Sequence, residues 1–213
     1  FVLMSNNTGE ISPVAEKSDV LEEKISVLDA ANPFSAPLTI AQSMKAAQPA
    51  PNVTIGDDGK IYVLYQDTVN EQTNIFLKTS TDNGKSFSEP VRVNLLDGNV
   101  ALDGRVAPTI QLGDDGEVYV TWANSRYEPN MFMGSYRQLV FTQSLDDGKS
   151  FEPSIIIGAE ELHSGKYFQH MSVDAFGGIH MAWLDGPAKM NATGYMEKDK
   201  SRDRGVKYTQ SLD

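Results

Sequence analysis

The sequence predicts an all-β fold built from four-stranded antiparallel sheets that recur along the chain. The first observation is an internal repeat, in which residues 50–63 return as residues 107–120 and, more weakly, as residues 171–183. The second is an octapeptide that follows the repeat in phase, at residues 80–87 and again at residues 144–151. Two sequence elements recurring in the same order indicate one structural unit used several times.

Each unit is expected to contain four strands, which in the first copy are Asn52–Ile55, Ile61–Tyr65, Asn74–Ser80 and Pro90–Asn94. A Gly-Asp-Asp-Gly turn joins the first two strands and suits a tight hairpin. The second strand is apolar throughout, as expected of a strand covered on both faces. Short four-stranded sheets at this spacing predict a β-propeller, whose stacked blades would cover that strand. A parallel αβ repeat is the alternative, but no intervening segment has helical periodicity.

Residues 32–213 are expected to form a partial propeller. Complete blades are predicted near residues 50–94 and 107–157, and a third blade, near residues 170–213, lacks its outermost strand. The segment Leu38–Ile40 aligns with the fourth strand of a repeat, so we expect it to be the outer strand of a further blade.

Residues 1–31 lie outside the repeat. They form either an irregular leader or a partial helix over residues 20–28, where apolar residues recur at helical spacing. The chain opens with four apolar residues, Phe1–Met4, which resemble the tail of a signal-peptide core. This opening slightly favours export, so we expect an extracellular or cell-surface protein.

The composition excludes several classes of function. The chain has 213 residues, with 18 basic and 29 acidic side chains, a net charge of −11 and a pI near 4.7. Nucleic-acid binders need basic surface, so no nucleic-acid partner is expected. No stretch reaches the roughly 18 apolar residues of a spanning helix. The chain has no cysteine, its three histidines lack metal-ligand spacing, and it has no phosphate-binding glycine loop, so no metal or cofactor is expected.

The two octapeptides carry a family resemblance. They read Ser-Thr-Asp-Asn-Gly-Lys-Ser-Phe from Ser80 and Ser-Leu-Asp-Asp-Gly-Lys-Ser-Phe from Ser144, and Ser211-Leu212-Asp213 repeats the opening of a third. They resemble the Asp-box, or bacterial neuraminidase repeat (BNR repeat), of the sialidase-like propeller superfamily. The resemblance implies a ring of about six blades, of which this chain would hold about three. It also implies a secreted protein that binds glycans or hydrolyses them as an exo-sialidase-type glycosidase.

The octapeptide residues are interpreted as structural. In such a turn the aspartate accepts backbone N–H groups, the glycine supplies a positive φ, and the aromatic ring packs into the blade. We therefore expect neither Asp82 nor Asp146 to be catalytic. The structural set comprises Ser80, Asp82, Gly84 and Phe87 in the first turn, and Ser144, Asp146, Gly148 and Phe151 in the second.

The resemblance places the ligand at the end opposite the octapeptides. That end would be built from the second-to-third-strand connections, which are Gln66–Thr73, Ala123–Gln138 and Leu184–Gly205, and from the connections Asn94–Arg105 and Gly158–Gln169. Equivalent positions in the repeats hold Asp67, Asn124 and Asp185, just past the second strand, and Arg105 and Lys166, just before the first. Together with Arg126, these residues are the candidate binding site for a carbohydrate or another small polar ligand. The alternative is that each is a solvated loop residue.

Catalysis is less well supported by the sequence than binding. True sialidases bind the sugar carboxylate with three arginines, because the guanidinium fork matches a carboxylate. Their first arginine lies in an Arg-Ile-Pro motif, and the nearest match here, Arg105-Val106-Ala107-Pro108, is one residue longer. The catalytic residues are therefore not assigned. A non-catalytic surface recognition or scaffold propeller is the alternative function.

Overall fold

The computed structural model describes residues 34–41, 51–96, 99–102, 104–127, 135–158, 164–187 and 205–211. The chain divides into two compact units, Phe1–Ile40 and Ala41–Asp213. The expected helix over residues 20–28 and the expected boundary after residue 31 lie outside the described residues. The strand expected at Leu38–Ile40 is not formed, since residues 35–41 have no strand structure and a strand needs a neighbour for its ladder.

The first sheet comprises β1 (Asn52–Ile55), β2 (Ile61–Val69), β3 (Gln72–Ser80) and β4 (Val91–Arg92). The strands pair in sequence order and all pairs are antiparallel. The Gly-Asp-Asp-Gly turn between β1 and β2 places Gly59 at a φ of 81°, a conformation that glycine adopts without strain.

The second sheet repeats this order with β5 (Thr109–Leu112), β6 (Val118–Tyr127), β7 (Ser135–Ser144) and β8 (Ile155–Ile157). A single 3₁₀ turn, η1 (Gly104–Val106), precedes β5.

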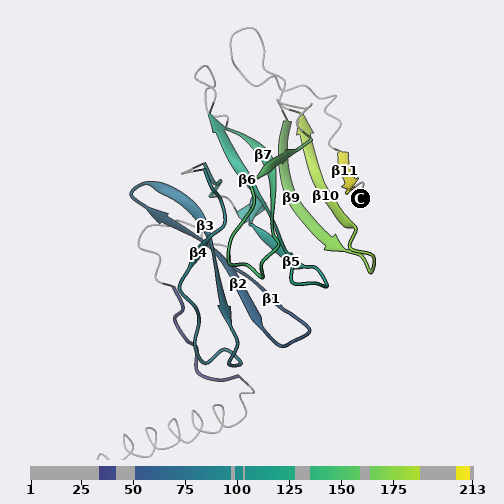
Figure 1. Cartoon of the computed structure of the whole chain (residues 1–213). Coiled ribbons are helices and arrows are strands. Elements are labelled where there is room, and N and C mark those ends of the chain that lie inside the picture. The colour runs from purple at the N-terminus through teal and green to yellow at the C-terminus, as the bar shows by residue number, and fades with distance from the viewer. Residues whose placement is uncertain are drawn as a thin grey trace, which may run out of the picture. The chain divides into compact units, whose positions relative to one another are not determined.

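The third sheet has three strands, β9 (Ser164–Val173), β10 (Ile179–Pro187) and β11 (Gly205–Gln210), with β10 in the centre. The prediction of an all-β fold with four-stranded antiparallel sheets is confirmed (Figure 1). None of the helical segments in the described part of the chain is long and apolar enough to cross a membrane.

Several expected loops are strands in the structure. The connection predicted at Gln66–Thr73 is a continuous hairpin, in which only Asn70 and Glu71 turn the chain, with φ of 50° and 66°. The polar residues of this segment are typical of a loop, so the sequence did not predict the strand. In the structure the hydroxyl groups of Thr68 and Thr73 are hydrogen-bonded across the hairpin at 2.9 Å. The connections predicted at Ala123–Gln138 and Leu184–Gly205 shorten in the same way, to residues 128–134 and 188–204, which lie outside the described residues.

Other boundaries also shift. The fourth strand expected at Pro90–Asn94 covers only Val91–Arg92. The first strand of the third sheet begins at Ser164, inside the connection expected at Gly158–Gln169.

The sheets face one another across two apolar layers. Between the first and second sheets, a large cluster includes Leu64, Leu77, Trp122 and Phe151. A smaller cluster, with Phe141, Met181 and Trp183 among its members, lies between the second and third sheets. Both faces of the second sheet are therefore covered, which explains the lack of polar alternation in its strand β6.

Candidate functional site

Each sheet has two chemically different ends. In the first sheet Ser80 lies opposite Ile61, whereas Asn74 lies opposite Asp67. Asp67 is six residue steps after Ile61 along β2, a rise of about 20 Å. The octapeptide and Asp67 are therefore at opposite ends of one hairpin. We call these the turn end, which holds residues 80–87 and 144–151, and the rim end, which holds Asp67 and its equivalents Asn124 and Asp185.

At the turn end, the aspartate of each octapeptide organises its loop. Asp146 Oδ1 accepts the Ser144 hydroxyl at 2.7 Å and the backbone N–H groups of Lys149 and Ser150 at 3.0 and 2.8 Å. Asp146 Oδ2 accepts the Ser150 hydroxyl at 2.6 Å. These bonds, above all those from Ser150 and Ser144, lower the pKa of Asp146 to about 2. The glycine that follows, Gly148, has a φ of 78°.

The first octapeptide has the same geometry. Asp82 accepts the backbone N–H of Ser86 at 2.9 Å and the Ser80 hydroxyl at 2.7 Å. The hydroxyl and backbone bonds from Ser86, followed by the bond from Ser80, hold the pKa of Asp82 well below its ordinary range. Gly84 again has a positive φ, of 79°. Both carboxylates are thus occupied by their own turns.

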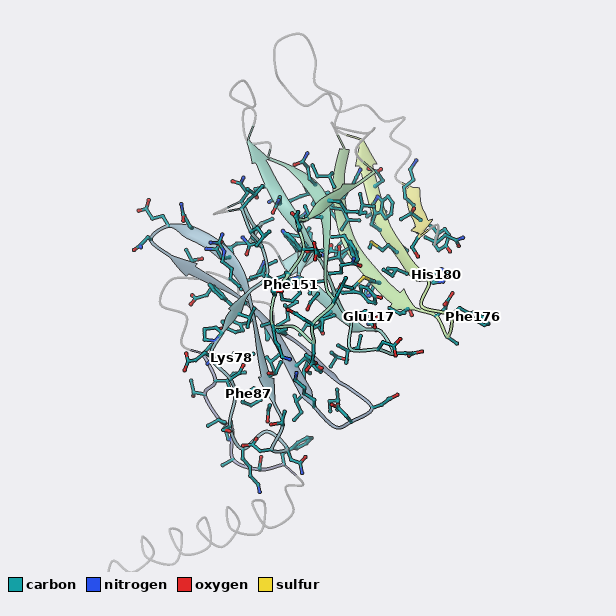
Figure 2. The ribbon with its side chains drawn as sticks, viewed as in Figure 1. Lys78, Phe87, Glu117, Phe151, Phe176 and His180 are labelled. Carbon is teal, nitrogen blue, oxygen red and sulfur yellow. The ribbon has the colours of Figure 1, made fainter. Side chains whose placement is uncertain are left out.

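The second octapeptide also links two sheets. Asp147 accepts hydrogen bonds from Lys60 Nζ and from the Tyr62 hydroxyl of the first sheet. Burial raises the pKa of Asp147, but the bonds from Lys60 and Tyr62 outweigh it, so its pKa is lowered. Burial and the Asp147 carboxylate raise the pKa of Tyr62. Figure 2 shows Phe151, the aromatic residue of this octapeptide, between the first and second sheets, where it is buried.

At the rim end, the structure brings Lys166 and Asp185 together. They are cross-strand partners on β9 and β10, and Lys166 Nζ lies 3.7 Å from Asp185 Oδ2. Both side chains are buried, with exposed fractions of 4% and 5%. The ammonium also lies 5.9 Å from the centre of the Trp183 ring. Lys166 and Asp185 were expected on loops but lie on strands. Both strands extend beyond the apolar residues from which they were predicted.

Arg105 joins the second sheet to the third. It lies in η1, is exposed, and holds its guanidinium carbon 4.9 Å from the centre of the Tyr167 ring on β9. This is cation–π geometry. Tyr167 is half-buried against Ala101, Val106 and Ala123, so the ring under the arginine has a fixed position.

A bulge in β9 sets the direction of these side chains. The register with β10 shifts between Ala182 and Leu184, so that Phe168 and Gln169 both lie opposite Trp183. Phe168 has a φ of 53° and is 53% exposed, whereas Gln169 is buried. Such bulges re-aim neighbouring side chains. Lys166, on the Ser164 side of the bulge, is buried.

Asn124 and Asp67 have hydrogen bonds to neighbours in their own strands. Asn124 Oδ1 accepts the indole N–H of Trp122 at 2.8 Å. Asp67 is half-buried and accepts the backbone N–H of Thr68 at 2.7 Å. Arg126 is part of β6, but its side chain lies outside the described ones.

Three further residues of the rim end escaped the sequence analysis. Gln66, which is 1% exposed, donates to the Ala101 carbonyl, and Gln169 Nε2 donates to the Ala107 carbonyl at 2.6 Å. Tyr167 is the third. Adjacency was a sequence signal for two of them, since Gln66 precedes Asp67 and Tyr167 follows Lys166, but Gln169 had no such signal.

The histidine interpreted as a core or rim residue, His180, is half-buried at the turn end of β10 (Figure 2). Its Nε2 lies 2.9 Å from Asp174 Oδ2 and its Nδ1 lies 2.8 Å from the Tyr208 hydroxyl. These contacts belong to one sheet. Among the described residues, no group of three or more histidine, aspartate or glutamate side chains could hold a metal ion.

Comparisons with known proteins identify the fold. No protein-family model and no curated protein matches the chain. A solved polysaccharide lyase of family PL25, an ulvan lyase bound to -[GlcA(1-4)Rha3S]-, has a TM-score of 0.52 and 13% identity, over 76% of this chain and 41% of that one. An α-L-arabinanase from Penicillium chrysogenum complexed with arabinobiose has a TM-score of 0.48 and 15% identity, over 78% and 46% of the two chains. A GH93 α-L-arabinofuranosidase of Fusarium graminearum with arabinobiose has a TM-score of 0.48 and 13% identity, with the same coverage.

The chain thus spans about two fifths of the ulvan lyase structure and just under half of the two arabinan-degrading enzymes. The likeness to the lyase, together with the strand order of the three sheets, shows an all-β fold of the β-propeller type.

Proposed function

We propose that this chain is part of a glycan-binding β-propeller, and that its rim end binds an acidic sugar. One observation carries the proposal: an exposed arginine, Arg105, lies against the aromatic ring of Tyr167 at the rim end. A guanidinium can donate two parallel hydrogen bonds to a carboxylate or sulfate, and an aromatic ring offers an apolar platform with a polar tip. This combination suits a small polar ligand better than a flat protein surface.

The fold and the octapeptides support the same class of ligand. The ulvan lyase was solved with an acidic saccharide. The resemblance of residues 80–87 and 144–151 to Asp-boxes supports a sialidase-like propeller in particular. An acidic sugar such as a sialoside or a uronate is therefore the proposed ligand class.

Binding is proposed ahead of hydrolysis. Most glycoside hydrolases use two carboxyl groups, about 5–9.5 Å apart, one of which must give or take a proton. Of the carboxylates predicted for the site, Asp185 is buried in an ion pair with Lys166. A carboxylate that is buried and paired with a cation of its own sheet is less accessible to a substrate than an exposed one. A non-catalytic recognition or scaffold propeller is therefore the second candidate, and this ion pair favours it.

The experiment is a calorimetric titration of the chain with sialyllactose and with a glucuronate disaccharide. Neutral lactose is the control ligand. Arg105→Ala should weaken binding of the acidic sugar by about 1.5–3 kcal/mol, or roughly tenfold or more, because a charge-assisted hydrogen bond is lost. The matched control is Lys85→Ala, which removes a cation at the turn end and should leave affinity unchanged. Equal affinities of the Arg105→Ala variant and the unchanged chain would overturn the site.

A fluorogenic sialoside separates the two functions. Turnover above a blank would identify a sialidase-type hydrolase. Binding without turnover would identify the recognition module.

An extracellular or cell-surface location belongs to the same proposal. It rests on the resemblance of residues 80–87 and 144–151 to Asp-boxes, which implies a secreted protein. Fractionation of cells that express the full gene would test it, and recovery of the protein in the cytoplasmic fraction alone would contradict it.

A further inference from the structure

The Tyr167 ring, which carries the Arg105 guanidinium over one face, rests at its far end on a glycine. Gly165 and Tyr167 are two residues apart on β9, so they face the same side of the sheet. A Cβ added at Gly165 would lie 2.6 Å from Tyr167 Cε2 and 2.8 Å from the Tyr167 hydroxyl oxygen, closer than such atoms approach one another. The hydroxyl end of the ring therefore lies directly against the backbone of Gly165.

This contact gives the ring a direction along the strand. Strand β9 begins at the rim end with Ser164 and ends at the turn end with Val173. Gly165 is therefore nearer the rim end than Tyr167, and the ring leans from Tyr167 towards the rim end. The Tyr167 hydroxyl is thus held at the same end of the sheet as Arg105.

Two polar groups of different chemistry are close together in this arrangement. The guanidinium carbon of Arg105 lies 4.9 Å from the centre of the ring that bears the Tyr167 hydroxyl. A guanidinium only donates hydrogen bonds, whereas a phenolic hydroxyl both donates and accepts them. Tyr167 is half-buried, and within the described part of the chain its hydroxyl has no hydrogen-bond partner. One ligand can therefore place an acid group on Arg105 and a hydroxyl group on Tyr167.

We propose that Tyr167 is a specificity-determining residue of the rim end, whose hydroxyl binds a hydroxyl group of an acidic sugar, and that Gly165 is the positioning residue that places the Tyr167 ring. The inference rests on the proposed function, because it takes an acidic sugar as the ligand. It adds a requirement, which is that the ligand carries a hydroxyl group near its acid group. Uronates and sialosides meet this requirement and simple carboxylates do not, so the rim end distinguishes between them.

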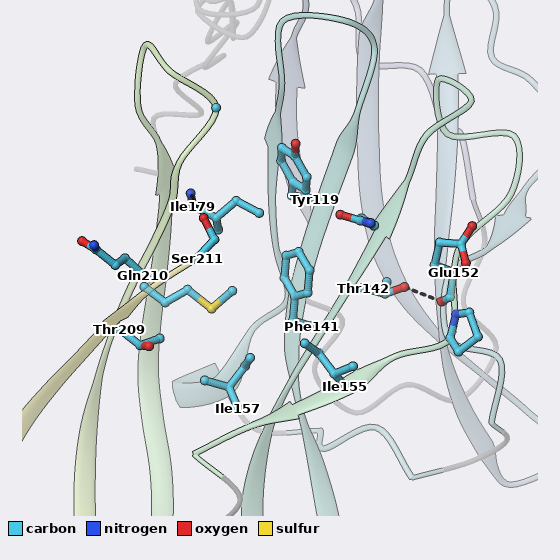
Figure 3. A pocket seen from close by; sticks show the side chains of 14 residues that line it. Tyr119, Phe141, Thr142, Glu152, Ile155, Ile157, Ile179, Thr209, Gln210 and Ser211 are labelled. Atoms are coloured by element: carbon cyan, nitrogen blue, oxygen red, sulfur yellow. Dashed lines mark hydrogen bonds between the residues drawn. The ribbon is translucent and has the colours of Figure 1, made fainter. Parts of the chain in front are cut away.

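A pocket of about 540 Å³ between the second and third sheets offers an apolar ligand another place to bind. It lies at the turn ends of these sheets, and Figure 3 shows the side chains of Tyr119 and Phe141 along its wall. Met181 also lines this pocket. The methyl signal of Met181 in NMR spectra therefore reports binding in the pocket, separately from binding at the rim end.

The test compares two acids with six-membered rings in NMR titrations of the 213-residue chain. Glucuronate carries hydroxyl groups near its carboxylate, and cyclohexanecarboxylate carries none. Tyr167→Phe, which keeps the ring, should weaken glucuronate binding roughly three- to tenfold, because one hydrogen bond is lost. The same variant should leave cyclohexanecarboxylate binding unchanged. Arg105→Ala should weaken the binding of both acids, because both place a carboxylate on the guanidinium.

A glycine variant and its matched control test the positioning role. Gly165→Ala should displace the Tyr167 ring, because the far end of a side chain moves more easily than a backbone. It should therefore shift the Arg105 Nε–Hε signal of the ligand-free chain and weaken glucuronate binding at least as much as Tyr167→Phe. The control is Gly186→Ala at the cross-strand partner of Gly165. Among the described residues, a Cβ at Gly186 would meet only the Gly165 carbonyl oxygen, at 3.8 Å, so the signal and the affinity should not change.

Other results would overturn the inference. If Tyr167→Phe weakens the binding of both acids equally, or of neither, the hydroxyl binds no sugar hydroxyl. An unchanged Arg105 signal in the Gly165→Ala variant would show that Gly165 does not place the ring. Shifts of Met181 without shifts of Arg105 would show that the acids bind in the pocket. If the unchanged chain binds neither acid, the proposed function fails as well, whereas binding that depends on Arg105 but not on Tyr167 overturns this inference alone.

Discussion

At the scale of single residues, the octapeptide carboxylates make the fold sensitive to acid. The pKa of Asp146 is about 2 in the folded chain, against an ordinary value of 3.8, so the folded state favours its ionised form. The stabilising contribution is fully present above about pH 4 and is lost as the pH falls from about 4 to about 2. We expect Asp146→Asn to lower the Tm at pH 7 by a few degrees and to have a much smaller effect near pH 2, where the folded-state carboxyl group is about half protonated.

Thermal unfolding followed by circular dichroism over this pH range measures the effect. Asp57→Asn is the matched control, since Asp57 is an exposed aspartate in a turn of the first sheet. A Tm difference between the Asp146→Asn variant and the unchanged chain that stays constant down to pH 2 would contradict the assignment of the acid sensitivity to Asp146.

Asp147, in the second octapeptide, accepts hydrogen bonds from two residues of the first sheet. Its removal leaves the Tyr62 hydroxyl and the Lys60 ammonium without this acceptor. Because the Asp147 side chain is 39% exposed, water compensates in part. We expect Asp147→Ala to lower the free energy of unfolding by about 1–2 kcal/mol, and Tyr62→Phe by less. Urea unfolding of both variants and of the double variant measures the coupling, and additive effects would show that the two groups do not interact.

At the scale of elements, the hairpin of β2 and β3 has a turn whose sequence does not suit its backbone. Asn70 and Glu71 both have positive φ, which a two-residue hairpin of this kind requires. Asparagine tolerates this conformation, but glutamate is strained there. We expect Glu71→Gly to raise the free energy of unfolding by up to about 1 kcal/mol, whereas Glu71→Ala, which keeps the Cβ, should not raise it. Urea unfolding measures both, and a destabilised Glu71→Gly variant would contradict the prediction.

The sequence predicted the repeated elements well and their ends poorly. The strand Asn52–Ile55 and the octapeptide turns were predicted because short runs of β-branched residues and Asp-Gly turns impose local geometry. The extension of β2 through Gln66, Asp67 and Thr68 was missed, because polar side chains in a strand resemble a loop until their cross-strand partners are known.

The contacts at the rim end could be predicted only in part. Repeat alignment placed Lys166 and Asp185 at the same end of the third sheet. Their pairing depends on the register of β9 and β10 and on the bulge at Phe168, which no local pattern in the sequence reveals. The contact between Arg105 and Tyr167 depends on how the second and third sheets pack against each other. Local sequence patterns do not predict that packing.

At the scale of the whole molecule, the interfaces between the sheets bury apolar clusters of different size. The cluster between the first and second sheets is larger than that between the second and third. The first sheet leaves Val53 and Ile55 exposed, at 63% and 62%, and the third sheet leaves Val206 exposed, at 79%. Phe176, in the turn between β9 and β10, is 97% exposed (Figure 2). Regions with fewer buried apolar contacts open locally at lower free energy than the rest of a protein.

We therefore expect the third sheet to open before the others. In native-state hydrogen exchange, amides of β10 and β11 should exchange at least about tenfold faster than those of β6 and β7, since a difference of only about 1.4 kcal/mol in opening free energy gives this ratio. The β6 and β7 strands are the internal control, because β6 lies at the centre of its sheet and Trp122, at 1% exposure, anchors it in the larger cluster. Met181→Ala should speed exchange in the third sheet while leaving the first sheet unchanged, because Met181 belongs to the smaller cluster alone. Equal protection of β6 and β10 would mean that the three sheets unfold as one cooperative unit, and that the smaller cluster stabilises its interface as strongly as the larger one.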